Sequence, residues 1–210
     1  MPCPHKFQAY LNLEKLDFEP EILIVGTFNP AWPDDNYAEW FYGRTRNNYF
    51  WDVLPRLYQS DLDFRQKPIQ VQDWKKFCRD NRIAITDLIY CIHDADSNNV
   101  SHQKALKSYT DESISNYFSQ IEFTDIVGLL KRHPSIRHTY LTTQAKIEVF
   151  NKRWIEVENF GKKHGIIANR LLTPSANARF QMGGYKKENP QDKTPLRNFI
   201  YQKWLDVWHR

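Results

Sequence analysis

The chain has 210 residues, of which 41% are hydrophobic, 26% charged and 15% aromatic, and only 7 are glycine. This composition excludes collagen-like and low-complexity proteins and predicts one globular domain over residues 1–210. The net charge of +4 is compatible with an anionic partner such as nucleic acid but does not require one.

The three cysteines, Cys3, Cys78 and Cys91, lie far apart in the sequence. They form no CxxC pair and cannot supply four thiolates, so zinc-ribbon, thioredoxin-like and iron–sulfur proteins are not indicated. The sequence predicts neither a metal nor another cofactor. Residues 1–7 contain no signal sequence, and no apolar run approaches the ~20 residues of a membrane span. We expect a cytoplasmic monomer that makes no contact with a membrane.

Four short apolar runs rich in β-branched residues predict strands at 21–26, 82–90, 136–142 and 165–173. Helical spacing of apolar residues between and after them predicts helices at 48–58, 73–80, 111–121, 125–130, 145–154 and 194–207. This alternation predicts βαβ units and a parallel sheet that is covered on both faces. The polar segment 180–193 is expected to be a surface loop with a function of its own.

Ligands of open parallel sheets bind outside the carboxyl ends of the strands. The segments expected there are 26–32 with 40–51, 93–99, 142–144 and 173–179. They are rich in Thr, Asn and Ser, carry several aromatic rings, and add arginines. Aromatic rings stack on nucleobases, arginines bind phosphates, and Asn amides hydrogen-bond to base edges. The combination predicts a site for a base of a nucleic acid.

Other chemistries have less support in the sequence. It contains no GxGxxG, GxxxxGK[ST] or GxSxG motif, so dinucleotide-binding, P-loop and α/β-hydrolase sites are not indicated. His93, Asp94 and Asp96 resemble a fragment of a metal site, but the remaining ligands are missing. We therefore interpret residues 93–99 as a polar loop.

Four segments, in the same order along the chain, resemble the uracil-DNA glycosylase superfamily, most of all its mismatch-specific and hypoxanthine-DNA glycosylase branches. Residues 22–30 resemble the first motif, a strand followed by glycine and a loop with proline. Residues 41–51 are similar to an aromatic–Gly–basic–Asn–x–Phe–Trp signature with one extra residue. Residues 83–88 resemble the second-strand pattern, and residues 173–177 resemble the Pro-Ser turn of the second motif.

This resemblance implies a three-layer α/β/α sandwich around a four-stranded parallel sheet. It implies an enzyme of base excision repair that flips a damaged or deaminated base, such as hypoxanthine or uracil, out of DNA and hydrolyses its N-glycosidic bond. The partner would be duplex DNA with a lesion or mismatch, or single-stranded DNA.

The resemblance also implies three groups of site residues. The candidates for positioning the attacking water are Asn29 and either Asn48 or, in an alternative register, Asn47. The candidates for binding the base are Thr27, Phe28, Tyr42, Thr142, Thr143 and Thr173. The candidates for binding the DNA are Arg44, Arg46, Ser175, Asn177 and Arg179.

Two positions depart from the family pattern. Uracil-directed members carry Asp or Asn two residues after the glycine of the first motif, where this chain has Phe28. Its second motif has Thr173 in place of His or Asn. We therefore expect a preferred substrate other than ordinary uracil. Two alternatives stay open: a DNA-binding relative that has lost the chemistry, and an unrelated α/β enzyme acting on a nucleotide or small aromatic compound.

Individual residues also have purely structural interpretations. Tyr42 could pack in the core against Trp51, and Asn47 or Asn48 could cap the helix that follows. Asp87, at the end of the second predicted strand, is expected to be structural rather than catalytic.

Overall fold

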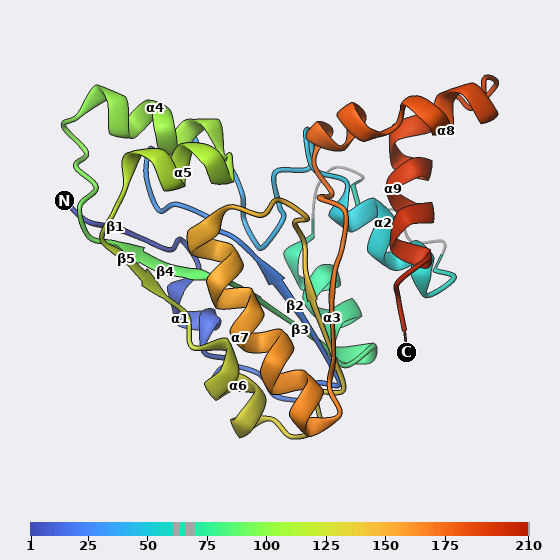
Figure 1. Cartoon of the computed structure of the whole chain (residues 1–210), viewed down its shortest axis with the longest axis horizontal. Coiled ribbons are helices and arrows are strands. Elements are labelled where there is room, and N and C mark those ends of the chain that lie inside the picture. The colour runs from blue at the N-terminus through green and yellow to red at the C-terminus, as the bar shows by residue number, and fades with distance from the viewer. Residues whose placement is uncertain (61–63, 66–69, 210) are drawn as a thin grey trace.

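The computed structural model describes residues 1–60, 64–65 and 70–209, and its central feature is a sheet of four parallel strands (Figure 1). The strands lie in the order β3–β2–β6–β7. Their bounds are Ile83–Asp87 for β3, Ile22–Gly26 for β2, His138–Leu141 for β6 and Ile167–Arg170 for β7. The predicted parallel sheet is confirmed, although β7 occupies only the middle of the 165–173 run.

Strand β2 shows why both faces of the sheet are covered. The helices around the sheet are α2 (Phe50–Leu57), α3 (Val71–Asp80), α6 (Ile126–Arg132), α7 (Glu148–His164) and α9 (Pro195–Leu205). Ile22 and Ile24 pack into a core with α2, α3 and α9, whereas Leu23 and Val25 pack into a second core with α6 and α7. Successive side chains of a strand point to opposite faces, so an uninterrupted apolar run fits a strand that is buried on both. The three-layer α/β/α arrangement is therefore confirmed.

A second, antiparallel sheet lies beside the first and was not predicted. Its order is β1–β4–β5, with the bounds Cys3–Pro4, Ile89–Ile92 and Ile121–Phe123, and the short α1 (Gln8–Leu11) follows β1. Residues 82–90, expected to be one strand, divide at Leu88 into β3 and β4, so that expectation is wrong. Apolar residues are buried on both sides of Leu88, and periodicity therefore gives no sign of the change of sheet.

Two helices, α4 (Val100–Ser108) and α5 (Asp111–Tyr117), come between β4 and β5 in the sequence and pack against each other (Figure 1). Helix α5 begins where predicted, and the Thr110 hydroxyl caps it by accepting a hydrogen bond from the Ser113 N–H. The prediction that it continues to Ile121 is wrong, because Ile121 belongs to β5. Residues 93–99 follow β4 of the small sheet, not the parallel sheet as expected.

The segment 180–193, predicted to be a loop, is partly helical. A 3₁₀ helix, η1, spans Ala176–Gln181, and α8 spans Gly183–Glu188. Helix α8 buries none of its side chains, which explains why no hydrophobic period indicated it. The helix predicted at 145–154 begins at Glu148 and runs to His164, where Gly165 ends it in the left-handed conformation.

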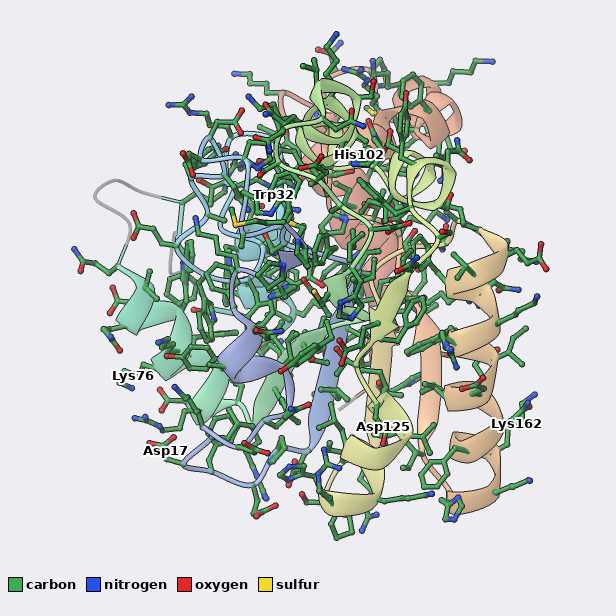
Figure 2. All side chains as sticks on the ribbon, turned by 90° about the vertical axis from the view of Figure 1, so that its left-hand side faces the viewer. Asp17, Trp32, Lys76, His102, Asp125 and Lys162 are labelled. Carbon is green, nitrogen blue, oxygen red and sulfur yellow. The ribbon has the colours of Figure 1, made fainter. Side chains whose placement is uncertain are left out.

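The outer helices carry charged side chains. Lys76 on α3 and Lys162 on α7 are exposed and point away from the sheet in Figure 2. Within the described part of the chain, no helix has both the length and the apolar character that a membrane span requires.

Candidate active site

A cavity of about 420 Å³ opens at the carboxyl ends of the parallel strands, where ligands of such sheets bind. The loops after β2 and β6, the segment before α2, the start of α5 and the turn before η1 all contribute to its lining. Most of the predicted site residues line it, namely Thr27, Phe28, Asn29, Tyr42, Arg44, Asn48, Thr142, Thr143, Thr173, Ser175 and Asn177. The fold therefore brings together residues that are more than a hundred positions apart in the sequence.

Three predicted residues lie outside this lining. Asn47 is exposed, and its carbonyl accepts a hydrogen bond from the Ala176 N–H at 3.0 Å. The exposed Arg46 places its guanidinium 5.4 Å from the centre of the Tyr37 ring. Arg179 is exposed on η1, with its guanidinium 5.0 Å from the centre of the Phe180 ring. Of the two asparagine registers left open by the sequence, Asn48 is the one that faces the cavity.

The floor of the cavity is formed where Gly26, Asp87 and Tyr42 meet. A Cβ atom on Gly26 would lie 2.2 Å from Asp87 Oδ1 and 2.8 Å from Tyr42 Oη. Both distances are below any real contact of a Cβ atom, so only glycine allows these two polar groups to approach the end of β2 so closely. Steric crowding by Asp87 and Tyr42 therefore explains why the first motif has glycine at position 26.

Tyr42 occupies the floor in a strained backbone conformation, with φ at +56°. Its ring stacks on Phe50 with a centroid distance of 3.8 Å and an interplanar angle of 3°. Its hydroxyl lies 2.8 Å from Thr142 Oγ1. Burial and the nearby Asp87 carboxylate hold the pKa of Tyr42 well above its usual value, so the phenol is neutral. Phe50 covers one face of the ring, which leaves the opposite face and the hydroxyl to meet the cavity.

Behind the floor, His5 and Asp87 form a buried pair that the sequence did not reveal. His5 Nε2 lies 2.7 Å from Asp87 Oδ2, and both side chains are almost fully buried. The Phe7 N–H donates a hydrogen bond to His5 Nδ1 at 2.9 Å. Because Nδ1 is an acceptor, Nε2 carries the hydrogen and donates a hydrogen bond to the Asp87 carboxylate. The two residues are 82 positions apart, so no local pattern could link them.

Asp111, the first residue of α5, brings a second carboxyl group into the cavity. Burial raises the pKa of this group to about 6, and the neighbouring Glu112 and Asp87 carboxylates also raise it. Hydrogen bonds from the hydroxyls of Thr27 and Thr143 act in the opposite direction, because they stabilise the ionised form. The sequence indicated Asp111 only as the start of a helix. The visible signal was an acidic residue directly after the N-cap Thr110, and it marked the beginning of the helix but not the cavity.

Arg44 supplies a cation to the lining of the cavity. Its guanidinium lies 3.3 Å from the centre of the Tyr109 ring, in contact with the aromatic face. Burial lowers the pKa of Arg44 from its usual value, although the group stays protonated at neutral pH. Tyr109 itself adopts a left-handed conformation, with φ at +51°, at the end of α4. The sequence predicted Arg44 but not the tyrosine that holds it.

Backbone contacts join the aromatic signature to the Pro-Ser turn. Asn48 and Ser175 form an isolated antiparallel bridge, and the Tyr49 N–H donates to the Pro174 carbonyl at 2.6 Å. Asn48 Oδ1 accepts the Phe50 N–H at 2.9 Å, a local turn contact two residues along the chain, whereas Tyr49 is the N-cap residue of α2. The Thr173 and Ser175 hydroxyls lie 3.1 Å apart. The Asn48–Ser175 bridge and the Tyr49–Pro174 hydrogen bond bring the two predicted motifs to the same side of the cavity.

No family model matches the sequence, and no curated protein matches it. Among solved structures, the chain is similar to a solution NMR structure from Methanosarcina acetivorans whose printed name is "putative Uracil DNA glycosylase". The two chains are 17% identical, with a TM-score of 0.52, and the match covers 91% of this chain and 94% of that one. This likeness confirms the fold inferred from the motifs, while membership of the superfamily and of a branch within it stays a prediction.

The fold and the cavity together define the class of the protein. It is an α/β protein whose fold is similar to that of the Methanosarcina acetivorans protein. Its cavity lies at the carboxyl edge of the parallel sheet and is lined by aromatic, hydroxyl, amide and carboxyl groups.

Proposed function

We propose that this protein is a DNA glycosylase that flips a damaged or deaminated base out of DNA and hydrolyses its N-glycosidic bond. The observation that carries the proposal is the convergence of the four resembling segments on one cavity at the carboxyl edge of the sheet. A base must leave the helical stack before such an enzyme can reach it, and a recessed site with an aromatic floor is suited to receive it.

In this proposal the base lies against Tyr42 and is read by the hydroxyls around it. The ring of Tyr42 is fixed by Phe50, so it offers a rigid surface for stacking. The hydroxyls of Thr142 and Thr143, at the end of β6, can each donate or accept a hydrogen bond at the edge of the base. Thr27 and Thr173 line the same cavity, and Phe28 is buried beside them.

The reaction needs an ordered water on one side of the sugar and stabilisation of the departing base. Asn29 and Asn48 both line the cavity and are our candidates for holding that water. Neither amide is a base, so each can orient the water but not remove its proton. Because position 28 has no carboxylate, we expect a preferred substrate other than ordinary uracil.

The DNA backbone would lie across the turn before η1. Ser175 and Asn177 line the edge of the cavity, and the exposed Arg46 and Arg179 flank it outside the lining. Phe180 is 77% exposed and lines the cavity together with Asn177. We propose that this ring enters the space that the flipped base leaves in the stack.

The test is release of free base from a panel of DNA substrates. Duplexes and single strands containing uracil, hypoxanthine, xanthine or mismatched thymine would be incubated with the protein, and released bases identified by mass. We expect release from at least one lesion, faster than from uracil. Absence of free base from every substrate would overturn the proposal.

A DNA-binding protein without catalytic activity is a second candidate, favoured by the buried Phe28 at the position of the family's acid or amide. The same panel separates the two functions. Binding to lesion DNA that weakens steeply with salt, without release of any base, would support the second candidate.

A further inference from the structure

The cavity contains acidic groups that the first motif alone would not supply. Asp87, Asp111 and Glu112 all line it. Asp87 is bonded to His5 at 2.7 Å, and Glu112 is exposed. Asp111 is partly buried, and the neutral hydroxyls of Thr27 and Thr143 offset part of the effect of burial on its pKa. Of the three, Asp111 is the carboxyl group in the lining that is neither paired with His5 nor exposed to solvent.

The packing of Phe28 shows how the chain places Asp111 there. Phe28 is buried in the core that also contains Ile114 from α5, Phe118 directly after α5, and Leu106 from α4. The apolar residue at position 28 therefore shares its core with the helix whose first residue is Asp111. Where uracil-directed members carry Asp or Asn, this chain has the buried side chain of Phe28. The helix in the same core places the carboxyl group of Asp111 near Thr27, the residue before Phe28.

We propose that Asp111 is the catalytic carboxylate that activates the attacking water, in place of the acid missing at position 28. This inference rests on the proposed glycosylase function. The C1′–N bond breaks and its electron pair leaves with the base, while the water oxygen forms the new bond to C1′. The Asp111 carboxylate takes one proton from this water and then passes it to the departing base. The products are the neutral free base and an abasic sugar with a hydroxyl at C1′.

The charged groups around Asp111 determine how this step depends on pH. Asp87 from β3 and the adjacent Glu112 oppose its ionisation, as does its own burial, whereas Thr27 and Thr143 favour it. The phenol of Tyr42, which also lies in its field, stays neutral, and Arg44 stays charged. With a pKa of about 6, Asp111 is mostly ionised at pH 7.5 and mostly protonated at pH 5. The rate should therefore fall about tenfold for each pH unit well below 6.

The experiment compares single-turnover rates of base release for the wild type, D111N and D73N on the best substrate from the panel, between pH 5 and 8. Asp73 is a matched control, because it is an exposed acid in the first turn of α3 and lies outside the cavity. We expect D111N to lose roughly 10²- to 10⁴-fold in rate at pH 7.5 and to lose the acid limb of the profile. D73N should match the wild type.

Two further measurements separate a catalytic role from a structural one. D111N should bind the lesion duplex with a Kd within about threefold of the wild-type value, and its melting temperature at pH 8 should not be lower. A D111N variant that is folded and keeps both the wild-type rate and the acid limb would overturn the role of Asp111 while leaving the proposed function intact. A wild type that releases no base would overturn both.

Discussion

The floor and the α5 side of the same cavity each contain a carboxyl group, and the two groups have different environments. On the floor, Asp87 accepts a hydrogen bond from the buried His5 ring at 2.7 Å. On the α5 side, the hydroxyl groups of Thr27 and Thr143 offset part of the effect of burial on Asp111, and its pKa rises to about 6. The comparison indicates that a buried histidine holds Asp87 in place, whereas Asp111 has a raised pKa and can change its ionisation state near neutral pH.

The largest expected effect is on the stability of the floor. His5→Ala leaves the Asp87 carboxylate buried without its donor, and breaking a buried pair in this way costs about 3 to 5 kcal/mol. Chemical denaturation would measure the loss in the free energy of unfolding. His93→Ala is the matched control, since His93 pairs with Glu122 at 2.8 Å on the surface, where such pairs contribute at most about 1 kcal/mol. Equal losses in the two variants would contradict the distinction.

A methyl group on the floor should have the next largest effect. Gly26→Ala places a Cβ atom 2.2 Å from Asp87 Oδ1, and the resulting shift should cost about 1 to 3 kcal/mol of stability. Gly184→Ala is the control, because Gly184 lies in α8 with open space around it, and alanine favours a helix over glycine by about 1 kcal/mol. Thermal unfolding should therefore shift in opposite directions for the two variants; a shared direction would argue against the steric role of Gly26.

On the α5 side, removal of the carboxylate should increase stability. The pKa of Asp111 is raised on folding from about 3.8 to about 6, so the folded protein binds more protons than the unfolded chain between these values. Stability therefore falls as the pH rises through this window. We expect Asp111→Asn to raise the free energy of unfolding by about 1 to 3 kcal/mol at pH 8, and to have little effect near pH 4. Denaturation at both pH values checks this, with no gain at pH 8 as the contrary result.

The smallest effect is expected for the hydroxyl of the stacked tyrosine. Tyr42→Phe keeps the stack on Phe50 but removes the 2.8 Å hydrogen bond to Thr142, which should cost about 0.5 to 1.5 kcal/mol. A double-mutant cycle with Thr142→Val isolates the pair, since the Thr142 hydroxyl also lies 3.3 Å from the Val25 carbonyl. Additive losses in the cycle would show that the two hydroxyls do not interact.

Strand β2 and the C-terminal helix show where sequence reasoning succeeded. The run Ile22–Gly26 is apolar at every position before the glycine, and the Thr194-Pro195 pair begins α9 where predicted. Both signals are local, because burial on two faces and a first-turn proline each leave a mark on neighbouring residues. The motifs around Tyr42 and Ser175 could also be found because each lies within a short continuous stretch of the sequence.

Helix α8, the divided run at Leu88 and the His5–Asp87 pair could not be found in this way. Helix α8 has no buried side chain, and buried apolar residues occur on both sides of the change from β3 to β4. The His5–Asp87 pair depends on the N-terminal segment lying beside the end of β3, through contacts 82 residues apart.

Local patterns were enough to predict the parallel sheet, its helical layers and the segments that follow the strands, because periodicity and turn residues act over a few positions. Which polar groups meet at the carboxyl edge depends on tertiary contacts instead. These contacts place Asn48 in the lining of the cavity and Asn47, Arg46 and Arg179 outside it, and they bring Asp111 in. They join segments that are far apart in the sequence, such as α5 and Phe28 in one core, and no local pattern encodes them.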